Sequence, residues 1–477
     1  MRKGLLASFA AAALLAAPSL AVALEPSDGE TFGSLGWVTI PGAPLVSFDI
    51  SWVDQAGTPG VGPNGLNFYF LADRSNASVD MFKIQVNPVP LKLTVAAPNQ
   101  FAGNVPTCPI ANACNGPNGV LTLLNPGSNA KEMWAGDGPT MQPGIGSPVC
   151  PTTCSTVKVF DSNGTLTRVI STGGVFRADE LCFAPPNAAA GRPNGLVLVA
   201  NDADSPPSIV LIATDGESAY KVVQTIQFKV ATNGIEQCQW DGTIGSFGRF
   251  LLNVPEVNGK GDDSSPGSVF TINPNVGVLP DFQATITPNP SNMGLVGNVD
   301  IDFCAGPQGM AIGPRTAMGV GDDVLLGCNA PAFNGFSNSV IINKGGGGGI
   351  GGIIATLQGQ GGADQVWFDP LAVHYFITGG SLLPTQTFGI TDAVTHQQDQ
   401  NITIGTTGMT TRRAHSTASW SGSGLGSTVT AAFLPVPATG GSATAPFTST
   451  VCGFSATQGC IAVFGVVPIP NPDVEIP

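Results

Sequence analysis

The sequence predicts an all-β protein, a seven-bladed β-propeller of four-stranded antiparallel blades. One observation is a short phrase, a polar residue followed by an apolar strand, that occurs seven times along the chain. A second is the spacing of the copies, 51 to 72 residues, which suits one supersecondary unit of a repeat protein. A third is the composition: 63 Gly, 40 Pro and only 10% charged residues favour short strands and tight turns over long surface helices.

The phrase is clearest in the middle and C-terminal parts of the chain. Copies read A-D-E-L-C-F-A-P from Ala178, A-D-Q-V-W-F-D-P from Ala363 and A-H-S-T-A-S-W-S from Ala414. Two weaker copies begin at Phe48 and Pro117. When the copies are aligned, the polar position is held in turn by Asp49, Asn118, Asp179, Glu236, Gln308, Asp364 and His415.

Further apolar runs follow most copies and predict the remaining strands of each blade. After the copy at Ala178 come G-L-V-L-V-A from Gly195, I-V-L-I-A-T from Ile209 and Y-K-V-V-Q-T-I from Tyr220. These runs are β-branched and bounded by turn residues, as strands are. The strand G-W-V-T-I from Gly36 precedes the first copy, and we expect it to pair with the C-terminal repeat and close the ring.

The ends of the chain are expected to lie outside the propeller. Residues 1–23 have the pattern of a secretory signal peptide: two basic residues, an apolar run and the small-x-small site Ala21-Val22-Ala23. The propeller is expected over 24–466, and a Pro-rich extended tail over 467–477. No later stretch has the length of a membrane-spanning helix. The sequence therefore predicts a periplasmic or extracellular protein without a transmembrane segment.

Ten cysteines and a net charge of −14 limit the chemistry of the chain. An even number of cysteines in an exported protein indicates disulfides, although their connectivity cannot be deduced from sequence. An acidic chain is a poor partner for nucleic acid. We expect it to bind a small-molecule ligand or other exported proteins instead. We also expect a monomer. The pairs that the spacing suggests are Cys108–Cys114, Cys150–Cys154, Cys182–Cys238, Cys304–Cys328 and Cys452–Cys460.

The phrases R-A-D-E-L, N-G-I-E-Q, G-A-D-Q-V-W-F-D-P and A-H-S resemble those of the exported seven-bladed propellers of the YVTN and lactonase-like superfamily. The resemblance covers most of residues 35–465. It implies the fold more strongly than an activity, because this superfamily includes lactonases, lyases and binding proteins.

The seven polar positions predict a ring of side chains at one mouth of the central channel. The innermost strands of a propeller all run the same way, so their first residues meet at one face. The loops between second and third strands return to that face. A concave, polar-lined opening of this kind is the default binding site. The residues expected to contact a ligand are Asp49, Asn118, Asp179, Gln308 and Asp364.

Acidic residues at this mouth suggest one possible cofactor, a divalent cation such as Ca²⁺. Carboxylate and amide oxygens are the ligands that such hard cations prefer. Gluconolactonase-like propellers hold one divalent metal through Glu, Asn and Asp, and the resemblance implies Glu180 or Glu236 with Asn201 and Asp202 as the equivalents. The alternative is structural: Asp and Asn commonly cap turns by accepting hydrogen bonds from backbone amides.

His415 is the one histidine at a ring position, and so the one general base or acid near neutral pH that the ring could supply. With Glu236 and Arg177 it could serve proton abstraction or lactone opening. Three functions therefore stay open. The first is a module that binds a small ligand or divalent cation at the mouth; the second is a lactonase-like or lyase-like enzyme at the same place; the third is a structural envelope protein.

Overall fold

The structure is a computed structural model of the 477-residue chain. It describes residues 31–40, 42–54, 67–84, 91–96, 101, 116–138, 155–244, 247–274, 285–287, 304–314, 323–330, 338–343, 353–379, 385–407, 413–424, 427–442 and 445–466. The signal peptide, the C-terminal tail and the pairs Cys108–Cys114 and Cys150–Cys154 lie outside these residues, so they stay predictions.

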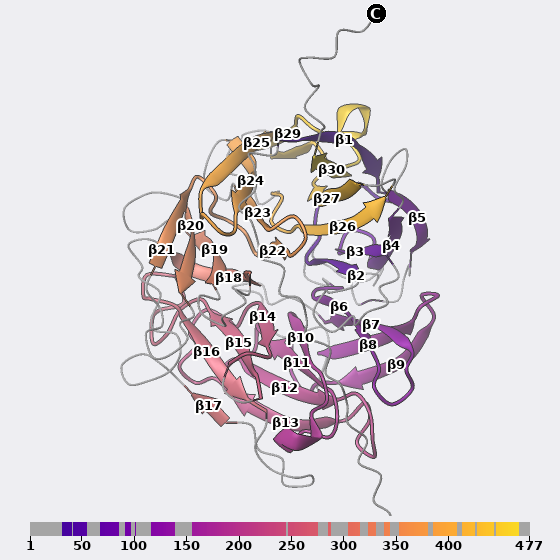
Figure 1. The fold of residues 1–477 in the computed structure, drawn as a ribbon, viewed down its shortest axis with the longest axis vertical. Helices are drawn as coiled ribbons and strands as arrows, with labels where there is room; N and C mark the ends of the chain where they lie inside the picture. The colour runs from indigo at the N-terminus through magenta and orange to yellow at the C-terminus, as the bar shows by residue number, and fades with distance from the viewer. Residues whose placement is uncertain are drawn as a thin grey trace, which may run out of the picture.

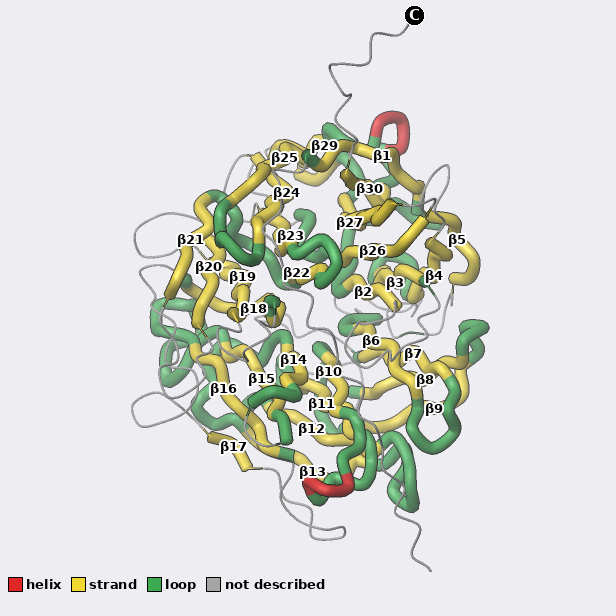
Figure 2. Tube along the Cα trace, in the orientation of Figure 1, coloured by secondary structure: helices red, strands yellow, loops and turns green. Residues whose placement is uncertain are grey.

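Seven antiparallel sheets are arranged radially around one axis, and the sequence predicted this seven-bladed propeller correctly (Figure 1). Each sheet begins with an inner strand beside the axis, and in the first five blades the strands proceed outward in chain order. Among the described residues, helical structure is limited to two 3₁₀ turns at the rim, Ala188–Ala190 and Gly453–Ser455 (Figure 2). None of the helices in the described part of the chain has the length and apolarity to cross a bilayer.

The first three blades are regular four-stranded sheets. Blade 1 contains β2 (Ser51–Asp54), β3 (Phe68–Asp73), β4 (Ser78–Ile84) and β5 (Leu91–Ala96). Blade 2 contains β6 (Val120–Leu124), β7 (Lys131–Asp137), β8 (Thr156–Asp161) and β9 (Leu166–Ser171). Blade 3 contains β10 (Leu181–Ala184), β11 (Leu196–Asn201), β12 (Ser208–Ala213) and β13 (Val222–Gln227).

The next three blades repeat this plan. Blade 4 contains β14 (Cys238–Asp241), β15 (Arg249–Val254), β16 (Ser268–Asn273) and β17 (Thr285–Thr287). Blade 5 contains β18 (Ala305–Ile312), β19 (Asp323–Ala330), β20 (Asn338–Asn343) and β21 (Ile353–Gln358). Blade 6 contains β22 (Val366–Asp369), β23 (His374–Gly379), β24 (Thr385–Asp392) and β25 (Gln398–Thr407).

The last blade joins the two ends of the propeller, as the sequence predicted. It contains β26 (Ala418–Gly424), β27 (Ser427–Val436), β30 (Cys460–Val466) and, outermost, β1 (Phe32–Thr39) from the start of the described chain. Strand β1 pairs antiparallel with β30 from Phe32↔Val466 to Thr39↔Cys460. The hairpin of β28 (Gly440–Ser442) and β29 (Ala445–Ser449) extends blade 6 instead, because β29 pairs with β25. A segment between two strands of blade 7 therefore pairs with blade 6 and links the two blades.

Burial decreases from the axis to the rim, which explains why apolar runs mark the inner strands. Every residue of β11 and β23 is buried, whereas the outer strands β9 and β13 are mostly half-buried or exposed. The apolar side chains pack between adjacent sheets, where sheet-on-sheet contacts exclude water. Trp134 is the largest of the fully buried side chains.

Three of the predicted disulfides are present in the described part of the chain. Cys182–Cys238 joins the inner strands of blades 3 and 4, and Cys304–Cys328 links the start of blade 5 to β19. Cys452–Cys460 holds the segment between β29 and β30 beside the closing strand pair. These bonds stabilise the neighbouring blades mainly by restricting the unfolded chain.

Candidate functional site at the mouth of the channel

The predicted polar ring lies at the beginnings of the inner strands. Six of its residues stand two or three positions before an inner strand, and Gln308 lies inside β18, next to a register shift between Pro307 and Met310. Backbone bonds join the segments around the axis: Asp364 N–H donates to His415 O at 2.9 Å, and Gln237 N–H to Gln308 O at 3.3 Å. The charge of Asp364 acts on both Asp49 and Glu236, and the Gln308 side chain donates a hydrogen bond to Glu236. The structure therefore brings together ring residues that are far apart in sequence.

Glycines allow blade 2 to approach the ring closely. A Cβ atom at Gly119 would lie 2.2 Å from the carbonyl oxygen of Asp179, and one at Gly136 would lie 2.4 Å from that of Ala178. A side chain at either position would therefore push blade 2 away from blade 3. This close approach lets the Asn118 Nδ2 donate to Ala178 O at 3.1 Å.

Arg74 joins the ring residues of blades 1 and 2. Its guanidinium forms an ion pair with Asp49 and donates to Asn118 Oδ1 at 2.7 and 3.1 Å. Arg74 belongs to the turn between β3 and β4, the class of loop expected at this face. Burial raises the pKa of Asp49, although the Arg74 charge opposes the shift.

Arg177 forms ion pairs with two acidic residues of blade 3 at the mouth. Its Nη2 lies 2.5 Å from Asp179 Oδ2 and 2.7 Å from Asp202 Oδ2. Asp202 also accepts the backbone N–H of Ile235 at 2.9 Å, which fixes the segment before Glu236. Burial raises the pKa of Asp179 to about 7, with Arg177 opposing the shift.

Glu236 and Gln308 lie side by side on blades 4 and 5. Gln308 Nε2 donates to Glu236 Oε1 at 3.1 Å. Both residues line a pocket of about 720 Å³ together with Arg177, Asp202 and Lys229. Two atoms of this lining, Arg177 Nε and Gln308 Oε1, are buried without a hydrogen-bond partner. The pocket therefore combines charged and uncharged polar side chains in its lining.

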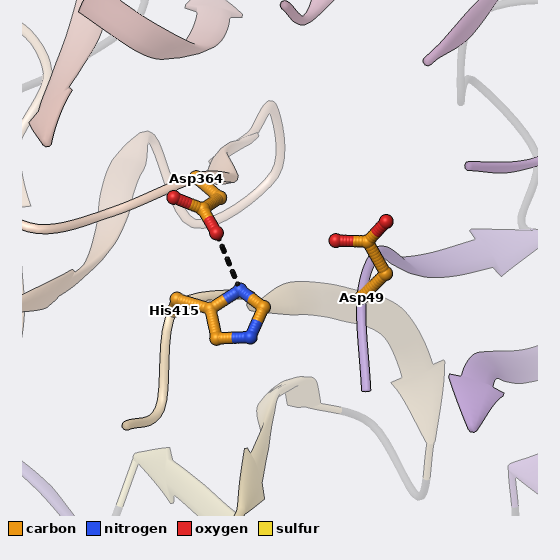
Figure 3. Close-up of side chains that lie close together, drawn as sticks. All are labelled: Asp49, Asp364 and His415. Atoms are coloured by element: carbon orange, nitrogen blue, oxygen red, sulfur yellow. Dashed lines mark ion pairs between the residues drawn. The ribbon is translucent and has the colours of Figure 1, made fainter. Parts of the chain in front are cut away.

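On blade 6, the next blade of the ring, Asp364 lies between Arg413 and His415. Arg413 Nη2 is 3.2 Å from Asp364 Oδ1, and His415 Nδ1 is 2.9 Å from Asp364 Oδ2 (Figure 3). The His415 ring stacks on Phe48 with centroids 4.6 Å apart and planes 2° from parallel. Burial alone would raise the pKa of Asp364, but Arg413 and His415 outweigh it and hold that pKa well below its usual range.

The two residues expected as metal ligands beside Asp202 have different surroundings. Glu180 is 4% exposed, and burial followed by the charge of Asp179 raises its pKa well above the ordinary value. Asn201 belongs to a network between blades: its Oδ1 accepts from Ser155 Oγ at 2.7 Å and Thr172 Oγ1 at 2.8 Å, and its Nδ2 donates to Ser208 Oγ. Glu180 is thus the more available metal ligand of the two, because the side chain of Asn201 is already hydrogen-bonded.

The predicted catalytic residues divide between two places in the mouth. Arg177 and Glu236 line the pocket, whereas His415 groups with Asp364 and Asp49. The ligand atoms of these last three residues lie within 4.8 Å of one another.

Arg74 contacts two ring residues but was not among the predicted site residues. Its place in the turn after the second strand of blade 1, a loop that returns to the mouth, is the sequence signal that could have revealed it.

A second polar layer beneath the ring was missed at the sequence level. Gln365 Oε1 accepts from Ser51 N–H at 2.9 Å and from Ser416 Oγ at 2.6 Å, and Gln365 Nε2 donates to Ser51 O. All three residues are fully buried. Each follows a ring residue by one or two positions, so this layer fixes Asp49, Asp364 and His415 relative to one another.

Comparisons with known proteins identify neither a family nor an activity. No protein-family model matches the chain, and no curated protein matches it. Solved structures that match include the Neurospora crassa Pan2 WD40 domain (10% identity, 92% of this chain and 96% of that chain, TM-score 0.45) and U3-55K (11%, 92% and 99%, 0.47). The RRP9 WD40 repeats match at 10% identity over 93% of this chain and all of theirs, with TM-score 0.46.

Proposed function

We propose that this protein is a secreted binding module whose channel mouth takes a small cationic ligand or a divalent cation. The observation that carries the proposal is an imbalance of charge. Six carboxyl groups line the mouth, against the three guanidinium groups of Arg74, Arg177 and Arg413 and the exposed ammonium group of Lys229. Among the described residues no ion pair joins a basic side chain to Glu180 or Glu236. The six are Asp49, Asp179, Glu180, Asp202, Glu236 and Asp364.

Burial makes this imbalance energetically relevant. Burial raises the pKa of Glu236 well above its ordinary value, and the charges of Asp202, Asp179 and Asp364 add to the shift. A buried carboxylate without a partner is costly, so a bound cation would offset its desolvation. The neighbouring pocket has room for a small molecule and supplies uncharged contacts through Gln308.

The wider setting is part of the same proposal. β-Propellers generally serve as interaction modules, and a ring of blades presents a rigid face to a partner. The three disulfides are typical of an oxidising compartment, which supports export to the periplasm or the cell exterior. We infer a monomer that belongs to the YVTN and lactonase-like superfamily, on the repeat phrases described above.

Calorimetric titration of the purified protein tests the binding function. The titrants are CaCl₂, MnCl₂, ZnCl₂ and a panel of small organic amines. We expect at least one to bind, and Glu236→Gln to weaken binding at the pocket about tenfold, because hydrogen bonds to charged groups contribute roughly 1.5–3 kcal/mol. Glu217→Gln, at an exposed turn, is the matched control. An absence of binding by every titrant, or equal weakening by both substitutions, would refute the proposal.

A lactonase-like or lyase-like enzyme is the second candidate, and the Asp364–His415 pair favours it. A carboxylate beside Nδ1 orients an imidazole so that Nε2 can take a proton. The test is turnover of a lactone panel by the parent protein and by His415→Ala and Glu236→Ala. Turnover that neither substitution lowers would remove these residues from the reaction.

A further inference from the structure

We propose that Asp49, Asp364 and His415 form a site for a first-row transition-metal ion such as Zn²⁺, distinct from the Glu236 pocket. The inference rests on the proposed cation-binding function of the mouth and names the ion and its ligands. One ligand atom from each residue lies within 4.8 Å of the other two, so a small shift of these side chains would let them share one ion (Figure 3). The three residues come from blades 1, 6 and 7, which the closure of the ring makes neighbours.

The contact between His415 and Asp364 is the observation that separates this group from an ordinary acidic cluster. His415 is 9% exposed, and its Nδ1 lies 2.9 Å from Asp364 Oδ2 as an ion pair without the geometry of a regular hydrogen bond. A short distance without hydrogen-bonding geometry is what two ligand atoms show when both lone pairs point to a common ion. The buried nitrogen, which has no regular hydrogen bond, then gains a partner in the ion.

The two arginines beside the site leave one oxygen of each carboxylate available. Arg74 contacts Asp49 Oδ2, and Arg413 contacts Asp364 Oδ1. Asp49 Oδ1 and Asp364 Oδ2 can therefore face the ion while the other oxygens are held. Side chains that hold ligating carboxylates in this way are a usual second layer of metal sites.

The imidazole is fixed just as firmly. Phe48 stacks on its face, and Ser51, Gln365 and Ser416 bind one another directly below. A rigid arrangement lowers the entropic cost of binding an ion. It also limits the choice of ion, because the ligands cannot move far.

The ligand set selects the class of metal. One imidazole nitrogen and two carboxylate oxygens suit Zn²⁺, Mn²⁺ or Co²⁺, whereas Ca²⁺ and Mg²⁺ prefer oxygen ligands alone. Three protein ligands would leave at least one position for water or another molecule. The site would then present a metal-bound group to the channel.

Metal binding by the full-length protein, treated with chelator and then titrated with ZnCl₂ or CoCl₂, tests the inference. We expect one Zn²⁺ per chain in competition with a chromophoric chelator, a Co²⁺ visible absorption band, and no displacement of either ion by Ca²⁺. His415→Gln and Asp364→Asn should each weaken Zn²⁺ binding at least tenfold. His396→Gln, at a partly exposed histidine that pairs with Asp323, is the matched control and should bind Zn²⁺ as the parent does.

Each alternative outcome overturns the inference. Zinc binding that persists in His415→Gln, or that is lost in His396→Gln, would place the ion elsewhere. Should His415→Gln fail to fold by near-UV circular dichroism, X-ray absorption of the zinc-loaded parent decides: one imidazole in the first shell supports the site, and none contradicts it. Ca²⁺ or amine binding that depends on Glu236 without any zinc binding would leave the proposed function standing and reject this site alone.

Discussion

Replacement of Arg177 by Met should destabilise the protein more than any other single change at the mouth. One guanidinium nitrogen lies 2.5 Å from Asp179 and 2.7 Å from Asp202, and the side chains of the three residues are only 16%, 3% and 10% exposed. Removal of one partner of a buried ion pair costs about 3–5 kcal/mol, because the other charge stays buried without compensation. We take about 3 kcal/mol, the lower end of this range, since Arg177 and Asp202 line the pocket.

The expected loss of stability can be measured by thermal and by urea unfolding. An unfolding entropy of about 2.1 cal/mol/K per residue converts 3 kcal/mol to a fall in Tm of roughly 3 °C for a chain of this length. Urea unfolding followed by tryptophan fluorescence gives the free energy directly. The matched control is Arg168→Met on the exposed face of β9, where a contact with the Tyr220 ring and an exposed hydrogen bond to Thr167 O are lost and about 1 kcal/mol or less is expected.

The pH dependence of the Arg177→Met variant provides a stricter test. Without the guanidinium, the pKa of Asp179, which burial already raises to about 7, rises further. A carboxyl whose pKa is higher in the folded than in the unfolded state favours folding at low pH, and this contribution is lost as the pH rises through the folded pKa. The deficit of the variant should therefore be smaller at pH 5 than at pH 8. A deficit under 1 kcal/mol at pH 8, or one that does not shrink on acidification, would refute the reasoning.

Three other predictions concern the fold. Phe32→Ala, at a side chain of β1 that is 1% exposed, should cost about 3–5 kcal/mol in urea unfolding, and a loss under 1 kcal/mol would mean that β1 contributes little to closure. Cys182→Ser with Cys238→Ser should cost about 4 kcal/mol for a bond that spans 56 residues, and an unchanged midpoint would contradict a stabilising bond between blades 3 and 4. Burial raises the pKa of Asp80 to about 6, so the Asp80 carboxyl favours folding below pH 4 and loses that contribution as the pH rises through 6. Asp80→Asn should therefore stabilise the protein at pH 8 relative to the parent. Equal or lower stability of the variant at pH 8 would count against a buried charge.

The fold could be predicted because its signals are local and repeated. A polar residue before an apolar strand occurs once per blade, and the strand at Gly36 had no partner in the first repeat, which indicated ring closure. The positions of Cys182 and Cys238 near the starts of two successive repeats suggested their pairing, which the structure contains. The hairpin of β28 and β29 could not be predicted, because its pairing with β25 depends on the position of blade 7 against blade 6.

The candidate site was only partly predictable from sequence. The ring positions follow from the repeat, so Asp49, Asp364 and His415 were found. Which side chains contact each other depends on the twist of each blade and on loop geometry, and these place Arg74 on Asp49 and bind Asn201 to Ser155 and Thr172. Asn201 is therefore a less available ligand than its position suggested.

Anomalous diffraction from crystals of the full-length protein soaked in ZnCl₂ or CaCl₂ tests most directly whether the mouth of the closed ring binds a cation. We predict a peak inside the ring formed by the starts of the seven inner strands, within about 2.5 Å of carboxylate oxygens. Peaks confined to the outer surface of the blades, with none inside the ring at saturating metal, would contradict the account.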